Sequence, residues 1–179
     1  MRTRTKNTSV ILAGSASLVA GLALWPSAAT AHPDDDRSAR AEVVEGDFAT
    51  EREAESFIDE DGSGLPSLGD VLVYTDSGTG TLGTSTNVGH CVLHDVDLEA
   101  DSATVHCSAT SEFDRGSLTF QCTSRVGLTS PVLLEPATWA VTGGTGEFRS
   151  AHGELHITGF EGSGPDFRTA GTFRLVLGR

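Results

Sequence analysis

Acid–base chemistry is the first possibility that the residue types raise, because it needs only a positioned carboxylate or imidazole. Three glutamates alternate at Glu51, Glu53 and Glu55, and one of them is a candidate to face the interior of the fold. The other candidates lie on the polar face of their segments, which faces solvent unless a bulge turns a residue inward; they are His106, Glu154 and His156. The catalytic residues therefore stay unknown.

Metal and nucleophile chemistry find less support. The chain has no Ser-His-Asp order typical of a catalytic triad, and its histidines and cysteines lack the spacing of a zinc site. Cys122 falls on an apolar face, where a thiol is packed and inert. We therefore predict no metal site and no cofactor.

The glycine-rich stretch "VTGGTGEFRSAHGEL" raises phosphate binding as a third possibility. A phosphate loop needs a helix after the glycines, and usually a Lys-Ser/Thr pair. Here the following residues alternate as a strand does, and no such pair is present. We therefore predict that Gly143, Gly144 and Gly146 are structural, with positive φ angles in a tight turn between two strands.

The first residues resemble a processing signal. Arg2, Arg4 and Lys6 precede a short apolar run that ends in small residues at 29–31, which predicts a signal peptide over 1–31 and a secreted protein. Removing these three bases changes the net charge from −13 to −16. This charge argues against nucleic acid and against anionic membrane surfaces as partners.

The exported part divides into a tail and one domain. Residues 32–46 are acidic and poor in large apolar side chains, which predicts a disordered tail, with the acidic cluster at 34–36 solvated rather than bound to a cation. Residues 47–179 suffice for one domain with one core.

Short alternating segments with turn residues between them predict an all-β domain without a convincing helix. The expected strands are 48–58, 69–76, 86–95, 102–112, 117–126, 136–142, 151–160 and 167–177. Eight strands are enough to close an antiparallel barrel, so we predict an up-and-down eight-stranded barrel with no Greek key. Cys107 lies within reach of both Cys91 and Cys122 across hairpins, and the residues alone leave the pairing open.

The glycine stretch resembles the pattern "TGGTGxFxxAxGxL" of allene oxide cyclases, plant dirigent proteins and a branch of secreted actinobacterial proteins. The similarity extends to "LGDVLVYTDSG" from Leu68, to the spacing of Cys91 and Cys107, and to "GSLTFQC" from Gly116, and covers most of 66–177. It implies a calycin-like barrel, a Cys91–Cys107 disulfide, and a homotrimer, because the relatives are often trimeric. The chain departs from the pattern at Cys122 and His152.

The resemblance also implies that the barrel holds a small hydrophobic molecule and steers ring closure or coupling mainly by its shape. We predict that four aromatic residues line the ligand pocket, Tyr74, Phe120, Trp139 and Phe173. Among them, only Tyr74 carries a hydroxyl that can orient a ligand.

Three functions remain open at this point. A dirigent-like binder, acting without covalent chemistry, predicts a cavity without an inward proton-transfer group. A cofactor-free cyclase or isomerase predicts the same cavity with an inward acid, histidine or tyrosine. An exported structural or interaction module predicts a filled barrel. The scarcity of inward polar residues favours the binder and the module over the enzyme.

Overall fold

The computed structural model describes residues 41–129, 133–162 and 166–178. The predicted signal peptide and residues 32–40 of the predicted tail lie outside these ranges. Among the described residues, no helix is long and apolar enough to cross a membrane.

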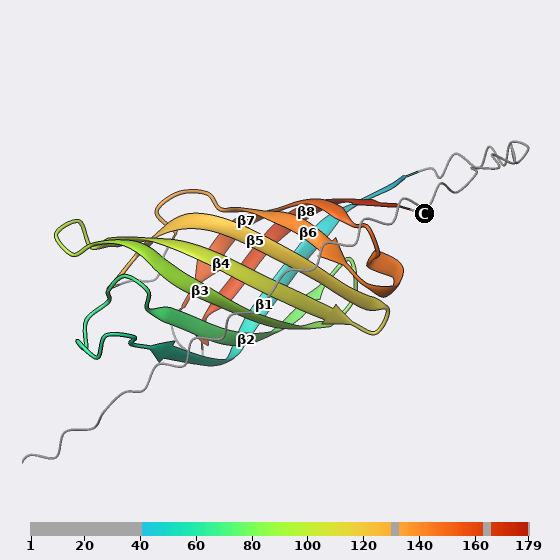
Figure 1. The fold of residues 1–179 in the computed structure, drawn as a ribbon. Coiled ribbons are helices and arrows are strands. Elements are labelled where there is room, and N and C mark those ends of the chain that lie inside the picture. Colours follow the sequence, from blue (N-terminus) through green and yellow to red (C-terminus); the bar gives the residue numbers. More distant parts are fainter. Residues whose placement is uncertain (1–40, 130–132, 163–165, 179) are drawn as a thin grey trace, which may run out of the picture. The chain divides into compact units, whose positions relative to one another are not determined.

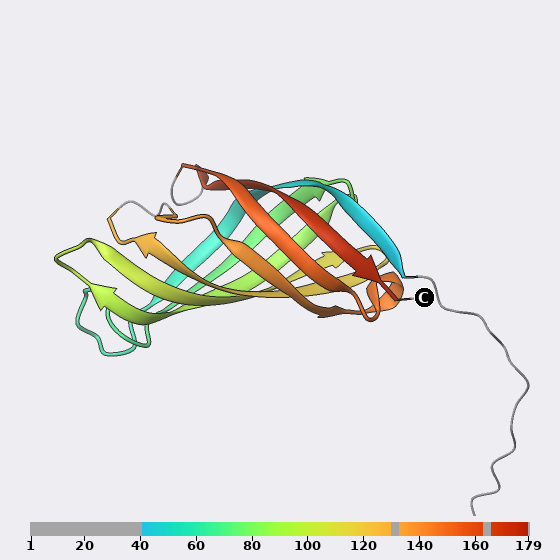
Figure 2. The same ribbon diagram turned by 90° about the horizontal axis from the view of Figure 1, so that it is seen from above.

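The fold is a closed barrel of eight antiparallel strands in which each strand pairs with its neighbours in sequence, and β1 pairs with β8 (Figures 1 and 2). The prediction of an all-β, up-and-down barrel is confirmed. The strands are β1 (Glu42–Ile58), β2 (Val71–Gly80), β3 (Ser85–Asp97), β4 (Ser102–Phe113), β5 (Gly116–Gly127), β6 (Thr138–Gly144), β7 (His152–Glu161) and β8 (Arg168–Leu177).

The first strand begins earlier than predicted. Residues 42–46, which we assigned to the disordered tail, pair with β8 from Glu42 opposite Leu177 to Gly46 opposite Phe173. The acidic composition of this segment hid its alternation, in which Val44 is half-buried between exposed neighbours. Closure of the barrel gives these residues hydrogen-bonding partners that a tail lacks.

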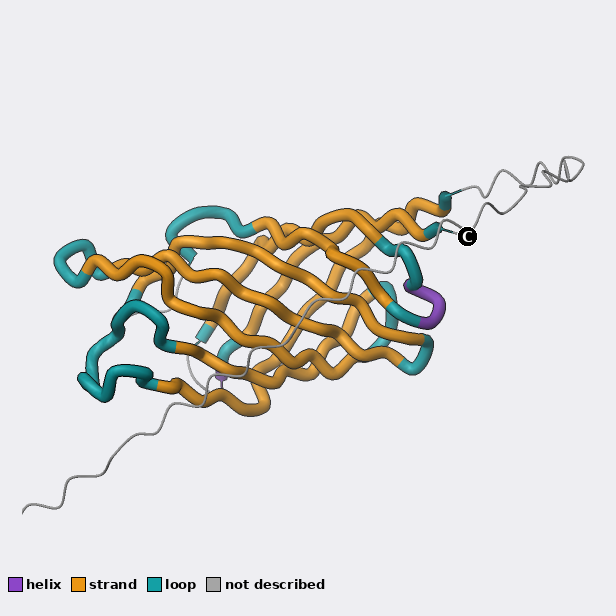
Figure 3. Tube along the Cα trace, viewed as in Figure 1, coloured by secondary structure: helices purple, strands orange, loops and turns teal. Residues whose placement is uncertain are grey.

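The turn after β6 closes one end of the barrel. It contains a short 3₁₀ helix, η1 (Gly146–Phe148), which Figure 3 shows at the end of the barrel opposite to the long β1–β2 loop. Phe148 is buried there, at 1% exposed, in a cluster that includes Leu118 and Leu175. The glycine stretch is therefore a structural turn, and its Phe148 side chain fills the core at this end of the barrel.

The glycines of this turn differ in what requires them. Gly143 and Gly146 have positive φ angles of 155° and 59°, as predicted. Gly144 is not among the positive-φ residues, so the prediction for it was wrong. A Cβ at Gly144 would lie 2.5 Å from the Phe148 carbonyl oxygen and 2.6 Å from that of Ser117, so close backbone approach requires glycine there.

Candidate functional site: a cavity with one polar wall

A cavity of about 490 Å³ lies inside the barrel. Its wall is predominantly apolar, with contributions from every strand. All four aromatic residues predicted to bind the ligand take part in this wall: Tyr74, Phe120, Trp139 and Phe173. The structure thus brings them together around one space large enough for a small organic molecule.

The polar part of the wall depends on a bulge in β1. Residues an odd number apart point to opposite faces of a regular strand, yet Arg52 and Glu55 both line the cavity. The register of β1 against β2 shifts between Arg52 and Ala54, which leaves Glu53 as an extra residue. This bulge returns Glu55 to the inner face, opposite Tyr74 on β2.

Arg52 is the centre of the polar wall. Its Nε lies 2.5 Å from Oδ1 of Asp76, the residue directly opposite on β2, and its Nη1 lies 2.6 Å from Oε2 of Glu55. The side chains of Arg52 and Asp76 are 6% and 8% exposed, whereas that of Glu55 is 37% exposed. One cation thus serves two carboxylates, and the three groups together carry one negative charge when all are ionised.

Two aromatic rings enclose the guanidinium. Cζ of Arg52 lies 4.6 Å from the ring centroid of Tyr74 and 4.7 Å from that of Phe167, which follows the β7–β8 loop. Both distances are within the range of cation–π attraction, which is strongest where water is excluded. The rings therefore fix the guanidinium plane while leaving the carboxylates to face the cavity.

Burial changes the proton affinity of this cluster. It raises the pKa of the Asp76 carboxyl above its ordinary value, and the ion pair with Arg52 opposes this rise without cancelling it. Burial, and then the nearby Asp76 carboxylate, raises the pKa of the Tyr74 phenol well above its ordinary value. Tyr74 therefore stays a hydrogen-bond donor at neutral pH, and Asp76 binds a proton more readily than a solvated aspartate.

A glycine makes room for Tyr74. Gly89 on β3 lies opposite Tyr74, and a Cβ at this position would lie 2.5 Å from the Tyr74 hydroxyl and 3.0 Å from the Ser108 carbonyl oxygen. Any side chain at residue 89 must therefore displace the phenol. This close approach is a constraint of the site that the sequence did not indicate.

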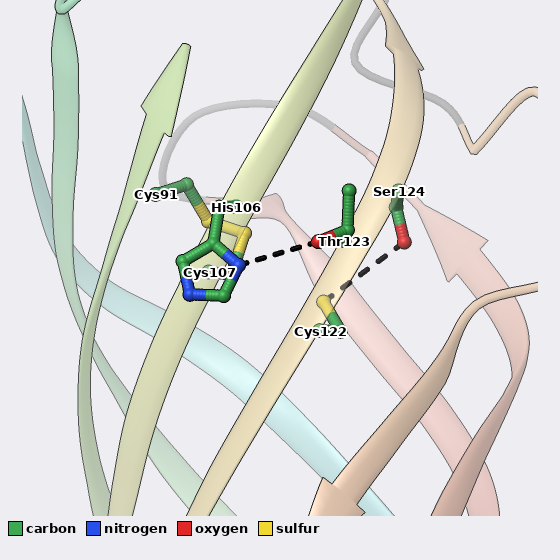
Figure 4. The surroundings of a disulfide bond; sticks show 6 residues. All are labelled: Cys91, His106, Cys107, Cys122, Thr123 and Ser124. Carbon is green, nitrogen blue, oxygen red and sulfur yellow. Dashed lines mark hydrogen bonds between the residues drawn. A yellow bond between two sulfur atoms is a disulfide. The ribbon is translucent and has the colours of Figure 1, made fainter. Parts of the chain in front are cut away.

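The cysteines line the same cavity on the neighbouring strands (Figure 4). Cys91 and Cys107 form a disulfide, the pairing that the family resemblance implies. Cys122 is a buried free thiol, and it accepts a hydrogen bond from the Ser124 hydroxyl at 3.9 Å. Burial raises the pKa of Cys122 to about 11, so the thiol stays protonated at neutral pH and is a poor nucleophile.

The remaining acid–base candidates lie outside the barrel. Nδ1 of His106 contacts the Thr123 hydroxyl at 3.2 Å on the outer surface. Nε2 of His156 lies 3.1 Å from Oε1 of Glu154, and both side chains are about half exposed, at 47% and 49%. The alternation of apolar and polar residues predicted that these side chains face outward, and no bulge turns them inward.

Arg52 and Asp76 were not predicted as site residues from the sequence. Both lie in segments predicted as strands, but a charged residue in a strand is more often on the outer face. The signal was the odd spacing of Arg52 and Glu55 within a glutamate-rich strand. Only the pairing with β2 reveals that a bulge places both residues inside.

Comparisons with known proteins support the fold. No protein-family model matches the chain, and no curated protein is significantly similar to it in sequence. Solved structures do match. A pyocyanin demethylase is 25% identical, with a TM-score of 0.54 over 74% of this chain and 99% of its own. A pterocarpan synthase dirigent protein is 15% identical, with a TM-score of 0.53 over 84% of this chain and 100% of its own.

A third similar structure is a Diels–Alderase from Streptomyces koyangensis. It is 14% identical, with a TM-score of 0.51 over 79% of this chain and 71% of its own. The chain thus shares its barrel fold with a dirigent protein and a Diels–Alderase, as the resemblance to the allene oxide cyclase and dirigent proteins implies.

Proposed function

We propose that the barrel binds a small, largely apolar organic molecule and catalyses an isomerisation or cyclisation of it without a cofactor. The observation that carries this proposal is the polar wall of Arg52, Asp76, Glu55 and Tyr74 in an otherwise apolar cavity. A cavity with an inward acid and an inward tyrosine is what the enzyme hypothesis requires. A filled barrel would leave no such space.

Three groups of the polar wall have distinct roles in this proposal. Asp76 donates or accepts the proton that moves during the rearrangement, because burial raises its pKa toward the operating range of a general acid–base catalyst. The Tyr74 phenol donates a hydrogen bond to a carbonyl, epoxide or hydroxyl oxygen of the substrate. Arg52 orients Asp76 and stabilises negative charge that develops on that oxygen.

The apolar wall supplies the rest of the rate enhancement. Phe120, Trp139 and Phe173 hold the carbon skeleton in one folded conformation, and orientation of this kind contributes up to about 7–11 kcal/mol. The similar solved structures are named as a pyocyanin demethylase, a pterocarpan synthase dirigent protein and a Diels–Alderase. These names support a small-molecule role and leave the substrate of this chain open.

A dirigent-like binder without proton transfer is the second candidate. It is favoured by the pairing of Arg52 with both Asp76 and Glu55, because a self-neutralised cluster can serve structure alone. Export from the cell and a homotrimeric assembly remain parts of the proposal for either candidate. The Cys91–Cys107 disulfide is compatible with an oxidising compartment.

Native mass spectrometry of the protein purified from its own host tests binding first. We expect a reproducible added mass that disappears in Trp139→Gln, and the same spectrum gives the subunit number. Glu154→Gln is the matched control, since it alters a carboxylate on the outer face. A bare protein mass that stays unchanged after incubation with unsaturated fatty epoxides and phenols would refute the binding proposal.

Asp76→Asn then separates the two candidates. If the barrel is an enzyme, this variant keeps the added mass but converts the extracted ligand to its isomer roughly 100-fold or more slowly, the usual contribution of general acid–base catalysis. An unchanged rate of conversion, or no conversion by either protein, would leave the binder as the function.

A further inference from the structure

A twelve-residue loop joins β1 to β2 and has the ligand spacing of an EF-hand calcium loop. The segment 59–70 reads "DEDGSGLPSLGD". EF-hand loops supply oxygen ligands from positions 1, 3, 5, 7, 9 and 12, have glycine at position 6, and use a backbone carbonyl at position 7. In this chain, oxygen-bearing side chains occupy positions 1, 3, 5, 9 and 12, and glycine occupies position 6: Asp59, Asp61, Ser63, Ser67, Asp70 and Gly64.

The fold brings the three carboxylates of this loop together. One oxygen each of Asp59, Asp61 and Asp70 lies within 4.8 Å of the others. Asp70 is 0% exposed, and among the described residues none of the three carboxylates forms an ion pair with a basic side chain. Backbone amides of the loop donate hydrogen bonds to all three carboxylates, and a cation between the carboxylates would offset their remaining mutual repulsion.

The loop backbone also brings two neutral oxygens together. Gly64, at position 6, has a φ of +74°, as a sharp reversal at this position requires. The Ser63 hydroxyl donates a hydrogen bond to the Leu65 carbonyl at 3.0 Å, so the oxygens of positions 5 and 7 lie side by side. The carboxylates of positions 1, 3 and 12 thus converge, and the oxygens of positions 5 and 7 contact each other within the same loop.

Position 9 carries a buried hydroxyl, an observation that is independent of the carboxylate cluster. The Ser67 hydroxyl oxygen is shielded from solvent and has no hydrogen-bond partner among the described residues. The Ser67 backbone amide donates a hydrogen bond to Oδ2 of Asp70 at 2.8 Å, which places this residue beside the carboxylates. A buried hydroxyl without a partner carries a desolvation penalty, which a cation beside Asp61 would relieve.

We propose that residues 59–70 form a Ca²⁺ site of EF-hand type, held between two strands instead of two helices. Calcium fits because it accepts six to eight oxygen ligands in irregular geometry. The loop departs from the EF-hand pattern at Asp70, where glutamate is usual, and at Ser63, where aspartate or asparagine is usual. Both changes weaken binding, and we expect a dissociation constant of about 10⁻⁴–10⁻³ M, as in extracellular modules.

The β1–β2 loop is connected to the cavity through residues that line it. Pro66, inside the loop, is part of the cavity wall. The backbone of Asp70 and Gly69 is hydrogen-bonded to Leu93 on β3, at 2.9 Å for each bond, and Leu93 also lines the cavity. A bound cation would therefore fix the part of the rim that Pro66 forms. This proposal reverses the prediction that the chain has no metal site, and it is independent of the proposed catalytic function.

Isothermal titration calorimetry of the mature protein with CaCl₂ tests the site. We expect one Ca²⁺ per chain, a higher melting temperature in about 10 mM CaCl₂, and weaker binding of Mg²⁺, which demands a more regular geometry. Asp61→Asn should weaken Ca²⁺ binding roughly tenfold or more, because it removes a charged ligand while asparagine can keep the hydrogen bond from the Ser63 amide.

Asp97→Asn is the matched control. Asp97 accepts hydrogen bonds from the Glu99 and Ala100 amides in the exposed β3–β4 turn, as Asp61 does from Ser63. This variant should bind Ca²⁺ as the unaltered protein does. The proposal is overturned if the protein gives no heat at millimolar CaCl₂, if Mg²⁺ binds more tightly, or if Asp61→Asn binds as well as Asp97→Asn. Circular dichroism without Ca²⁺ shows that each variant is folded.

Discussion

The two sides of the cavity are built from different chemistry. The wall formed by β5, β6 and β8 is apolar and packed, with Leu118, Phe120 and Leu175 at most 6% exposed. The wall formed by β1 and β2 carries Arg52 and Asp76, both nearly buried. Apolar walls alone would keep the barrel stable, because buried charged residues rarely stabilise a fold more than apolar residues in the same place. The second wall is therefore better explained by function than by folding.

The largest expected effect concerns the core cluster that packs against the apolar wall. Phe148→Ala should lower the free energy of unfolding by about 3–5 kcal/mol, because Phe148 is 1% exposed and its loss leaves a cavity in the core. Urea denaturation followed by far-UV circular dichroism measures it. Phe57→Ala is the control, since Phe57 is 48% exposed at the other end of the barrel. Equal losses in both variants would refute the view that η1 anchors the core.

Breaking the ion pair gives the next effect. Arg52→Met leaves the Asp76 carboxylate buried without its cation, and we expect a loss of about 3–5 kcal/mol at neutral pH, less wherever Asp76 takes up a proton. The double variant Arg52→Met/Asp76→Leu should recover most of this loss, because no unpaired charge remains. If the double variant is as unstable as the single one, the pair is structural and the assignment of this wall to function fails.

Alternation of apolar and polar residues was enough to predict one wall and not the other. It located Phe120 and Phe173 on inward faces, because regular strands obey a period of two. It missed Arg52 and Asp76, because the β1 bulge interrupts that period and a bulge depends on pairing with a distant strand. The proposed site in the β1–β2 loop was not predicted for another reason: its candidate ligands are carboxylates and hydroxyls, which are also the ordinary residues of a solvated loop.

A smaller effect distinguishes Asp76 from an ordinary carboxylate through pH. Because its pKa is raised in the folded state, folding favours its protonated form. The stability from this protonation is fully present below the unfolded pKa, about 3.9, and is lost as pH rises through the folded pKa. The Asp76→Asn variant has no titrating group at this position, so it does not lose stability in this way as pH rises. We therefore expect the variant to gain stability relative to the unaltered protein between about pH 4 and neutral pH. Urea denaturation across this range measures the difference, and a constant difference would contradict the shift.

The smallest expected effect lies on the outer face of the barrel. Glu154 and His156 form a pair at 3.1 Å that resembles the Arg52–Asp76 pair in distance but is about half exposed. Water screens such a pair, so Glu154→Gln should change the free energy of unfolding by at most about 1 kcal/mol. Urea denaturation at neutral pH, alongside Arg52→Met, measures the contrast directly. A loss as large as that of Arg52→Met would mean that burial does not determine how much these pairs contribute to the free energy of unfolding. The distinction between the polar wall and the surface would then have no energetic basis.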